Sequence, residues 1–254
     1  MRKRNILLRL AYDGTDFNGY QVQAQGERTV QGVLDMALAK LHGHSVTSVA
    51  AGRTDSGVHA DSQCVSFYSD RDGIPEEKFT AALNRLLPPD LKVQQSREVP
   101  ETFHARYSAT YRGYRYYVLV SQVPVPKYRN YSWRVRAPLT IDRLNEDSHA
   151  LVGERDFTTF AAAGQSQESN VRTVYRALFT WEPPFVVFSI EANGFLWKMV
   201  RSIVGTMVER ESARLRCETV ELSVEEILER RKRDLAGVTA PPQGLFLTEV
   251  GYDE

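Results

Sequence analysis

The sequence predicts an α+β protein made of two domains with a cleft between them. Three observations lead to this fold class. The chain has 254 residues, of which 42% are hydrophobic and 25% charged, which is enough to bury one large core or two smaller ones. In each half, segments in which apolar and polar residues alternate, as in strands, are followed by segments with apolar residues at helical spacing. No apolar run approaches the ~20 residues that cross a bilayer.

The first half predicts three strands and two helices. Its basic start resembles that of a signal peptide, but Arg9 interrupts the apolar stretch and no small-residue cleavage site follows. Residues 30–43 predict a helix with one apolar face. Residues 75–89 predict a helix with Pro75 near its start, acidic residues in its first turn and a proline pair at its end. The predicted apolar face comprises Val33, Leu34, Ala37, Leu38 and Leu41. The predicted strands are residues 4–12, 63–69 and 91–99.

The second half repeats this mixture, although no sequence repeat is convincing. A capping box of Ser223 and Glu226 starts the last predicted helix, and Gly237 ends it. The predicted helices are residues 140–153, 196–210 and 223–237. The predicted strands are residues 113–120, 174–181, 185–192 and 245–250.

Charge is segregated along the chain, although the formal net charge is zero. We predict domains at residues 1–105 and 106–254, with a basic, aromatic-rich linking segment at about 105–140. Between Thr102 and Ile141 lie seven basic residues, nine aromatic residues and not one Asp or Glu. Basic side chains bind phosphate and aromatic rings stack on unpaired bases, so the segment is typical of RNA binding. A solvated basic strand pair, with tyrosines filling a sheet face, is the alternative.

The cysteines and metal-ligand residues exclude several classes of protein. Cys64 and Cys217 are too few for a disulfide framework, and no CxxC or HExxH spacing occurs. We therefore expect a soluble cytoplasmic protein without a metal site. His42 and His44, at the end of a predicted helix, are expected to be solvated.

The stretch "GRTDSGVHA", residues 52–60, is the strongest candidate for a functional site. It sets Asp55 between Gly52 and Gly57, which permit unusual backbone angles and the close approach of a ligand. An aspartate in such a turn is more often a cap or an Asx-turn. His59, four residues later, suggests a hydrolytic pair as another possibility.

The whole stretch resembles the active-site signature of the TruA-type tRNA pseudouridine synthases. Five further motifs resemble that family in the same order, over about 240 residues. They are "YDGTDFNGYQ", "TFHARYSATYRGYRY", "GERDFTTF", "NGFLWKMVRSIVG" and "PPQGLFLTEV".

The resemblance implies isomerisation of uridine to pseudouridine in the anticodon stem-loop of tRNA, at positions 38–40 in tRNA numbering. The family needs no cofactor or metal, which fits the absence of a phosphate loop or dinucleotide fingerprint here. It also implies two similar domains, each an antiparallel sheet with helices, around a central RNA-binding and active-site cleft. A homodimer that binds tRNA, and neither DNA nor membranes, is expected. A catalytically silent RNA-binding protein and an Asp55/His59 hydrolase are the competing hypotheses.

The resemblance matches individual functional residues of the family to positions in this chain. Asp55 resembles the family's essential nucleophile or base, whose glycine neighbours admit a flipped nucleotide. Tyr114 resembles the tyrosine that stacks on the uracil, and Arg201 the arginine paired with the catalytic aspartate. Arg53 resembles the arginine that holds the base flipped out. The further substrate-binding candidates are Gly57, His59 (which shapes the loop in the family), Leu245 and Arg112.

Some positions depart from the family pattern. This chain has Tyr20 where the family has Trp, and Val22 where a basic residue is frequent. It has Lys198 where His is common and Ser202 in place of Asn. The resemblance therefore does not extend to the choice of tRNA. Tyr116 and Tyr117 are expected to be sheet tyrosines.

Overall fold

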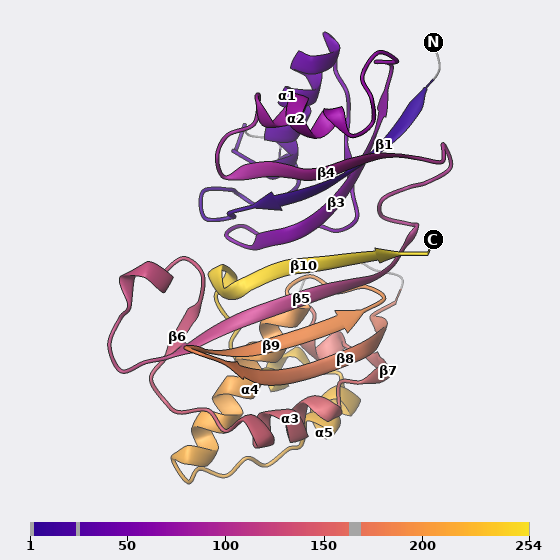
Figure 1. Cartoon of the computed structure of the whole chain (residues 1–254). Coiled ribbons are helices and arrows are strands. Elements are labelled where there is room, and N and C mark those ends of the chain that lie inside the picture. The colour runs from indigo at the N-terminus through magenta and orange to yellow at the C-terminus, as the bar shows by residue number, and fades with distance from the viewer. Residues whose placement is uncertain (1–2, 24–25, 163–168, 254) are drawn as a thin grey trace. The chain divides into compact units, whose positions relative to one another are not determined.

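The computed structural model describes residues 3–23, 26–162 and 169–253, which form two compact units. The first unit contains the described residues up to Thr110 and from Phe246 onward, and the second contains those of 111–245. Each unit combines strands with helices, so the α+β prediction is confirmed (Figure 1). No helix among the described residues is long and apolar enough to cross a membrane.

The sheet of the first unit has the strand order β4, β1, β3, β10. These strands are β4 (Leu91–Val99), β1 (Arg4–Tyr12), β3 (His59–Ser69) and β10 (Leu245–Tyr252), and the short β2 (Val49–Ala50) pairs with β3. β1 runs antiparallel to β3 and β4, whereas β10 runs parallel to β3, with Phe246 opposite His59. The C-terminal strand thus accompanies the first unit, although the sequence-based boundary assigned residues 246–254 to the second.

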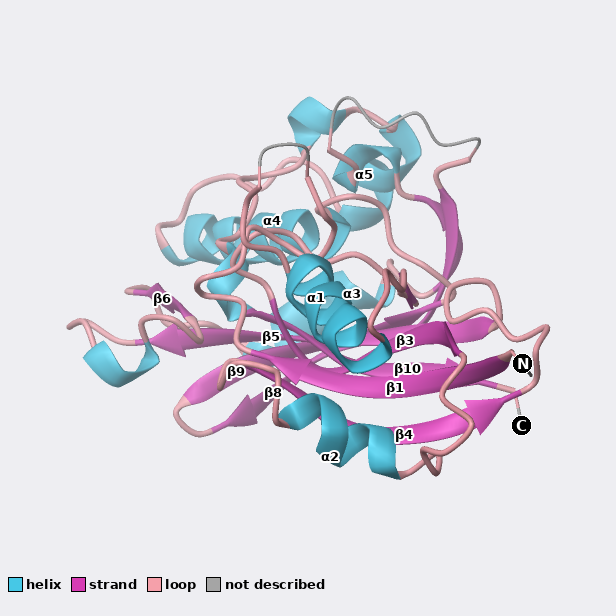
Figure 2. Ribbon diagram, turned by 90° about the horizontal axis from the view of Figure 1, so that it is seen from above, coloured by secondary structure: helices cyan, strands magenta, loops and turns pink. Residues whose placement is uncertain are grey.

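Helices α1 (Val30–His42) and α2 (Lys78–Asn84) cover one face of this sheet (Figure 2). The ring of Phe67 on β3 contacts His42 of α1 and Phe79 of α2, each with ring centroids 5.8 Å apart. α1 matches the predicted helix: the Thr29 hydroxyl accepts a hydrogen bond from Gly32 N at its start, and Gly43 ends it with a φ of 78°. Of the predicted apolar face, Leu34, Ala37 and Leu38 are buried.

The structure corrects two predictions in this unit. α2 begins at Lys78, not at Pro75, because Glu76 bonds to β4: its carbonyl accepts from Ser96 Oγ at 2.7 Å, and its carboxylate accepts from Glu98 N. His42, expected to be solvated, is 3% exposed, and its ring nitrogens bond to Leu38 O (2.8 Å) and Ser69 Oγ (2.9 Å).

The sheet of the second unit has the strand order β5, β9, β8, β7, all antiparallel neighbours. The strands are β5 (Ala109–Val120), β9 (Phe185–Ala192), β8 (Val171–Glu182) and β7 (Gly153–Asp156), and the short β6 (Trp133–Val135) pairs parallel to β5. Each unit's antiparallel sheet therefore contains one parallel pair. The predicted linking segment at about 105–140 holds β5 and β6, so much of it is strand.

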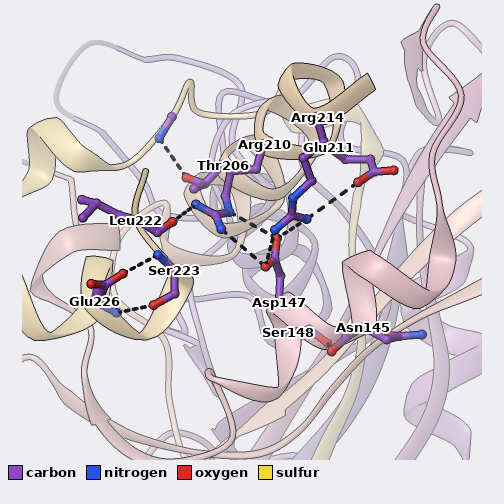
Figure 3. A network of polar contacts seen from close by, with 11 residues as sticks. Asn145, Asp147, Ser148, Thr206, Arg210, Glu211, Arg214, Leu222, Ser223 and Glu226 are labelled. Carbon is purple, nitrogen blue, oxygen red and sulfur yellow. Dashed lines mark hydrogen bonds and ion pairs between the residues drawn. The ribbon is translucent and has the colours of Figure 1, made fainter. Parts of the chain in front are cut away.

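Helices α3 (Ile141–His149), α4 (Met199–Leu215) and α5 (Val224–Arg230) lie on the same side of this sheet (Figure 1). A charged network joins the first two of them (Figure 3). The Asp147 carboxylate on α3 accepts two hydrogen bonds of 2.9 Å from Arg214 and one of 3.2 Å from Arg210, both on α4. These side chains are largely buried, so the pairing holds α4 in a defined position.

The last helix begins as predicted and ends earlier. The Ser223 hydroxyl accepts from Glu226 N at 3.1 Å, and the Glu226 carboxylate accepts from Ser223 N at 2.7 Å, which is the predicted capping box (Figure 3). However, α5 ends at Arg230, and Arg231 after it takes a left-handed φ of 51°. Gly237, predicted to end it, lies against α4 instead, where its N–H donates to Thr206 Oγ1 at 2.9 Å.

Candidate active site

Asp55 lies half-buried in the loop between β2 and β3. Val58 N donates to the Asp55 carbonyl at 3.1 Å and closes a turn around Ser56 and Gly57. Gly57 has a φ of 77°, a conformation that L side chains rarely adopt. Gly52 does not take the unusual backbone angle predicted for it: its φ is ordinary, and a Cβ placed there meets nothing within 4 Å. Only Gly57 therefore needs to be glycine for the backbone of this loop.

The "YDGTDFNGYQ" motif braces the Asp55 loop. Tyr20 N donates to Thr54 O at 3.0 Å, and Gly57 N donates to Phe17 O at 3.3 Å. Gly14 lies so close that a Cβ would sit 2.1 Å from Val58 O. Two motifs that are some 35 residues apart in the sequence therefore form one structural element. This coupling was not predicted from the sequence, where only the glycines signal it.

A buried hydroxyl pair lies directly before Asp55. The hydroxyls of Tyr12 and Thr54 are 2.8 Å apart and buried. Burial raises the pKa of Tyr12 to about 12, so this hydroxyl stays protonated at neutral pH. Thr54 is thereby tied to the end of β1, and it fixes the backbone from which Asp55 projects.

His59 is built into the same scaffold. It is 1% exposed, and its ring stacks on Phe246 with centroids 4.5 Å apart and planes 19° from parallel. Gly14 N donates to His59 Nδ1 at 3.0 Å. The neighbouring Asp13 carboxylate lies 3.2 Å from the same ring nitrogen. These contacts suit a residue that shapes the loop.

Arg53 differs from its neighbours. Its side chain is exposed and makes no hydrogen bond or ion pair with another described residue. A cation held only by its backbone is available for an anionic ligand such as phosphate.

Tyr114 and Arg112 lie on β5 in the second unit. Tyr114 is 8% exposed, and its ring meets Phe195 edge-on at 5.0 Å and 86°. It stands opposite Ile190 of β9. Arg112 is half-buried, and its Nη1 donates to Asn193 O at 3.0 Å. Both side chains are thus ordered by the turn that follows β9.

Arg201 lies half-exposed in the first turn of α4, beside the buried apolar residues Met199, Val200, Ile203 and Val204. Its Nε donates to Ala240 O at 2.8 Å, and its own carbonyl accepts from Ala240 N at 3.0 Å. The guanidinium is therefore held by a backbone carbonyl from residues 237–244, which run along α4. Leu245, 6% exposed, follows this segment as the first residue of β10.

Apart from Arg112, the basic residues of the 102–141 stretch divide into two groups. Arg115 pairs with Glu182, and Arg134 Nη1 donates to Ser121 O at 3.2 Å, so these two support the fold. The others on the surface are Arg106, Lys127, Arg129 and Arg136. This second group, rather than the whole stretch, presents positive charge to solvent.

The four residues that depart from the family pattern also fall into two groups, two that are buried and two that are not. Tyr20 and Ser202 are buried, so their side chains pack inside their own units. Val22 is 52% exposed, and the Lys198 ammonium lies 4.6 Å from the centre of the Trp197 ring. The described residues contain no group of three or more His, Cys, Asp or Glu side chains suited to a metal ion.

Comparison with known proteins agrees with these motifs. The tRNA pseudouridine synthase family matches residues 10–108 and 148–253. A protein of Treponema denticola named tRNA pseudouridine synthase A is 43% identical over 99% of this chain and 94% of its own. Proteins of the same name from a Thermoanaerobacter species (41% identical; 98% of this chain, 100% of its own) and from Halalkalibacterium halodurans (44%; 96% and 90%) are equally similar.

Proposed function

The chain belongs to the tRNA pseudouridine synthase family and isomerises uridine in tRNA to pseudouridine, and we propose that it does so in the anticodon stem-loop, at positions 38–40 in tRNA numbering. In this proposal Asp55 is the nucleophile or base, no cofactor takes part, and the enzyme is a homodimer.

The observation that carries the proposal is the braced Asp55 loop. The complete signature "GRTDSGVHA" is present, and the loop is tied to the "YDGTDFNGYQ" motif through Thr54 and Gly57. A catalytic carboxylate must be held within a fraction of an ångström of its working position. A loop that is bonded at both sides of Asp55 meets that requirement.

We assign the other roles residue by residue. With tRNA bound, Tyr114 stacks on the target uracil, Arg201 pairs with the catalytic carboxylate, and Arg53 holds the nucleotide flipped out. An arginine suits the carboxylate because it stays charged and offers two parallel hydrogen bonds. The remaining substrate-binding assignments are Gly57, His59, Leu245 and Arg112.

The reaction needs no redox partner because it is an isomerisation. The bond from N1 of uracil to C1′ of the ribose breaks, the base turns over while it is held, and C5 bonds to C1′. The proton on C5 leaves and N1 gains one, so atoms and electrons balance. Acid–base and nucleophilic groups of the protein are sufficient for these steps.

Tritium release tests this function. Transfer RNA labelled with tritium at C5 of uridine should lose label to water on addition of the enzyme, without added metal or nucleotide. Mapping the product by sequencing tests positions 38–40 separately. Loss of activity in EDTA would contradict the cofactor-free part, and label release from other positions would contradict the site assignment.

The Asp55→Asn variant tests the assigned carboxylate, because it keeps the shape of the side chain and removes its charge. Turnover should fall to background while tRNA affinity stays within a few-fold, since phosphate contacts supply most of the binding. Asp72→Asn makes the same change at an exposed position outside the motifs and should react normally. Measurable turnover by a verified Asp55→Asn variant would remove Asp55 from this role.

A further inference from the structure

Residues 237–244 are fastened along one side of α4. Gly237 N donates to Thr206 Oγ1 at 2.9 Å, and Val238 N donates to Glu209 Oε2 at 3.0 Å. The reciprocal pair between Arg201 and Ala240 adds a third attachment, in the first turn of α4. The carbonyl that holds the Arg201 guanidinium therefore depends on where this segment lies.

Tyr116 holds the segment from the sheet side. This β5 residue is completely buried, and its hydroxyl donates to Pro241 O at 2.7 Å. Its ring lies against Gly244, where a Cβ would sit 2.7 Å from the ring atoms. Tyr116 thus contacts the segment on both sides of Gln243, and its bonded carbonyl belongs to the residue after Ala240.

The orientation of Arg201 follows from these contacts. A guanidinium is planar, so a bond from Nε to a fixed carbonyl sets the plane of the whole fork. Because bidentate pairing with a carboxylate depends on that plane, a small rotation changes the geometry of both hydrogen bonds.

We propose that Tyr116 is a positioning residue for catalysis, which sets the Arg201 guanidinium through Pro241 and Ala240. The proposal rests on the role assigned above to Arg201. Burial raises the pKa of Tyr116, and the nearby Arg201 charge opposes that rise, so Tyr116 remains a protonated donor throughout an assay range near neutrality.

The test compares Tyr116→Phe, Arg201→Ala and the double variant in single-turnover assays at saturating tRNA. Tyr116→Phe should lower the rate by about 10- to 100-fold, a cost typical of a slightly misplaced catalytic group, with tRNA affinity unchanged. The pH–rate profile of Tyr116→Phe should change in the same way as that of Arg201→Ala, because both variants disturb the same guanidinium. The double variant should be no slower than Arg201→Ala, since both changes remove one function.

Tyr252→Phe is the matched control. Its hydroxyl also donates to a backbone carbonyl, that of Ala105 at 2.9 Å, and its loss should leave the rate and the pH profile unchanged. The Nε–H signal of Arg201 in nitrogen-15 NMR gives a second readout that needs no turnover. It should shift in Tyr116→Phe and stay in place in Tyr252→Phe.

The results distinguish the positioning role of Tyr116 from the catalytic role of Arg201. If Arg201→Ala is slow but Tyr116→Phe reacts at the wild-type rate, the positioning role is refuted and the role of Arg201 stands. Independent, multiplying losses in the double variant also refute it. If Arg201→Ala itself reacts normally with an unshifted profile, both claims fail together.

Discussion

Tyr12 shares a buried hydrogen bond with Thr54, the residue before Asp55. Both side chains are buried, so the bond is not readily replaced by one to bulk water. Removing one partner leaves the other buried and unpaired, which costs about 1–3 kcal/mol, whereas removing both costs less. The pair is therefore a local source of order in the Asp55 loop.

Thr54→Val and Tyr12→Phe should each lower the free energy of unfolding by about 1–3 kcal/mol in urea titrations, and the double variant by less than their sum. Both should also slow turnover. Tyr20→Phe removes a buried hydroxyl that has no hydrogen-bond partner among the described residues, and should change stability by less than about 0.5 kcal/mol. Strict additivity of the two single changes would show that the hydroxyls do not act as a pair.

Helix α4 owes its position to two different kinds of contact. On one side, Asp147 of α3 pairs with Arg210 and Arg214 (Figure 3). On another side, Gly205 lets the backbone at Val238 come so close that a Cβ would lie 1.7 Å from the carbonyl oxygen. Any side chain at Gly205 must push residues 237–244 away from the helix.

Gly205→Ala should therefore destabilise the protein by about 1–3 kcal/mol or more, despite the better helix propensity of alanine. It should also slow catalysis, because the Ala240 carbonyl that holds Arg201 moves with the segment. Gly73→Ala, where a Cβ meets nothing within 4 Å, is the control. Thermal unfolding of both variants checks this, and an unchanged melting temperature in Gly205→Ala would contradict the close approach.

The molecule as a whole carries no net charge, so its attraction for tRNA has to come from local clusters. The exposed cations of the 102–141 stretch are the candidates, since Arg115 and Arg134 are engaged in the fold.

Charge reversal at Arg129, one of these exposed cations, should weaken tRNA binding and flatten its salt dependence. Each lost phosphate contact should reduce the slope of log affinity against log salt by about 0.7–0.9. Arg85→Glu, an exposed change outside the stretch, is the control for net charge. Equal slopes for all variants and the wild type would place the stretch away from the RNA.

The sequence by itself determined the class of fold and most elements, because alternation and helical spacing are local properties of the chain. Residues 4–12, 91–99 and 185–192 form strands with the predicted ends, and the α5 capping box needs only residues that are three apart. It also identified the family, through motifs that are each contiguous. The site residues assigned from those motifs, Asp55 among them, stay predictions.

Only the tertiary structure decided what depends on partners distant in the chain. The start of α2 is set by contacts of Glu76 with β4, and the burial of His42 by Ser69. β10 completes the first unit by pairing with β3, and Gly237 serves α4 rather than ending α5. No local pattern marks Tyr116, because its function as a donor arises only when residues 237–244 return to β5. Hydrogen bonds and close contacts between remote segments form after the chain folds, so neither spacing nor propensity encodes them.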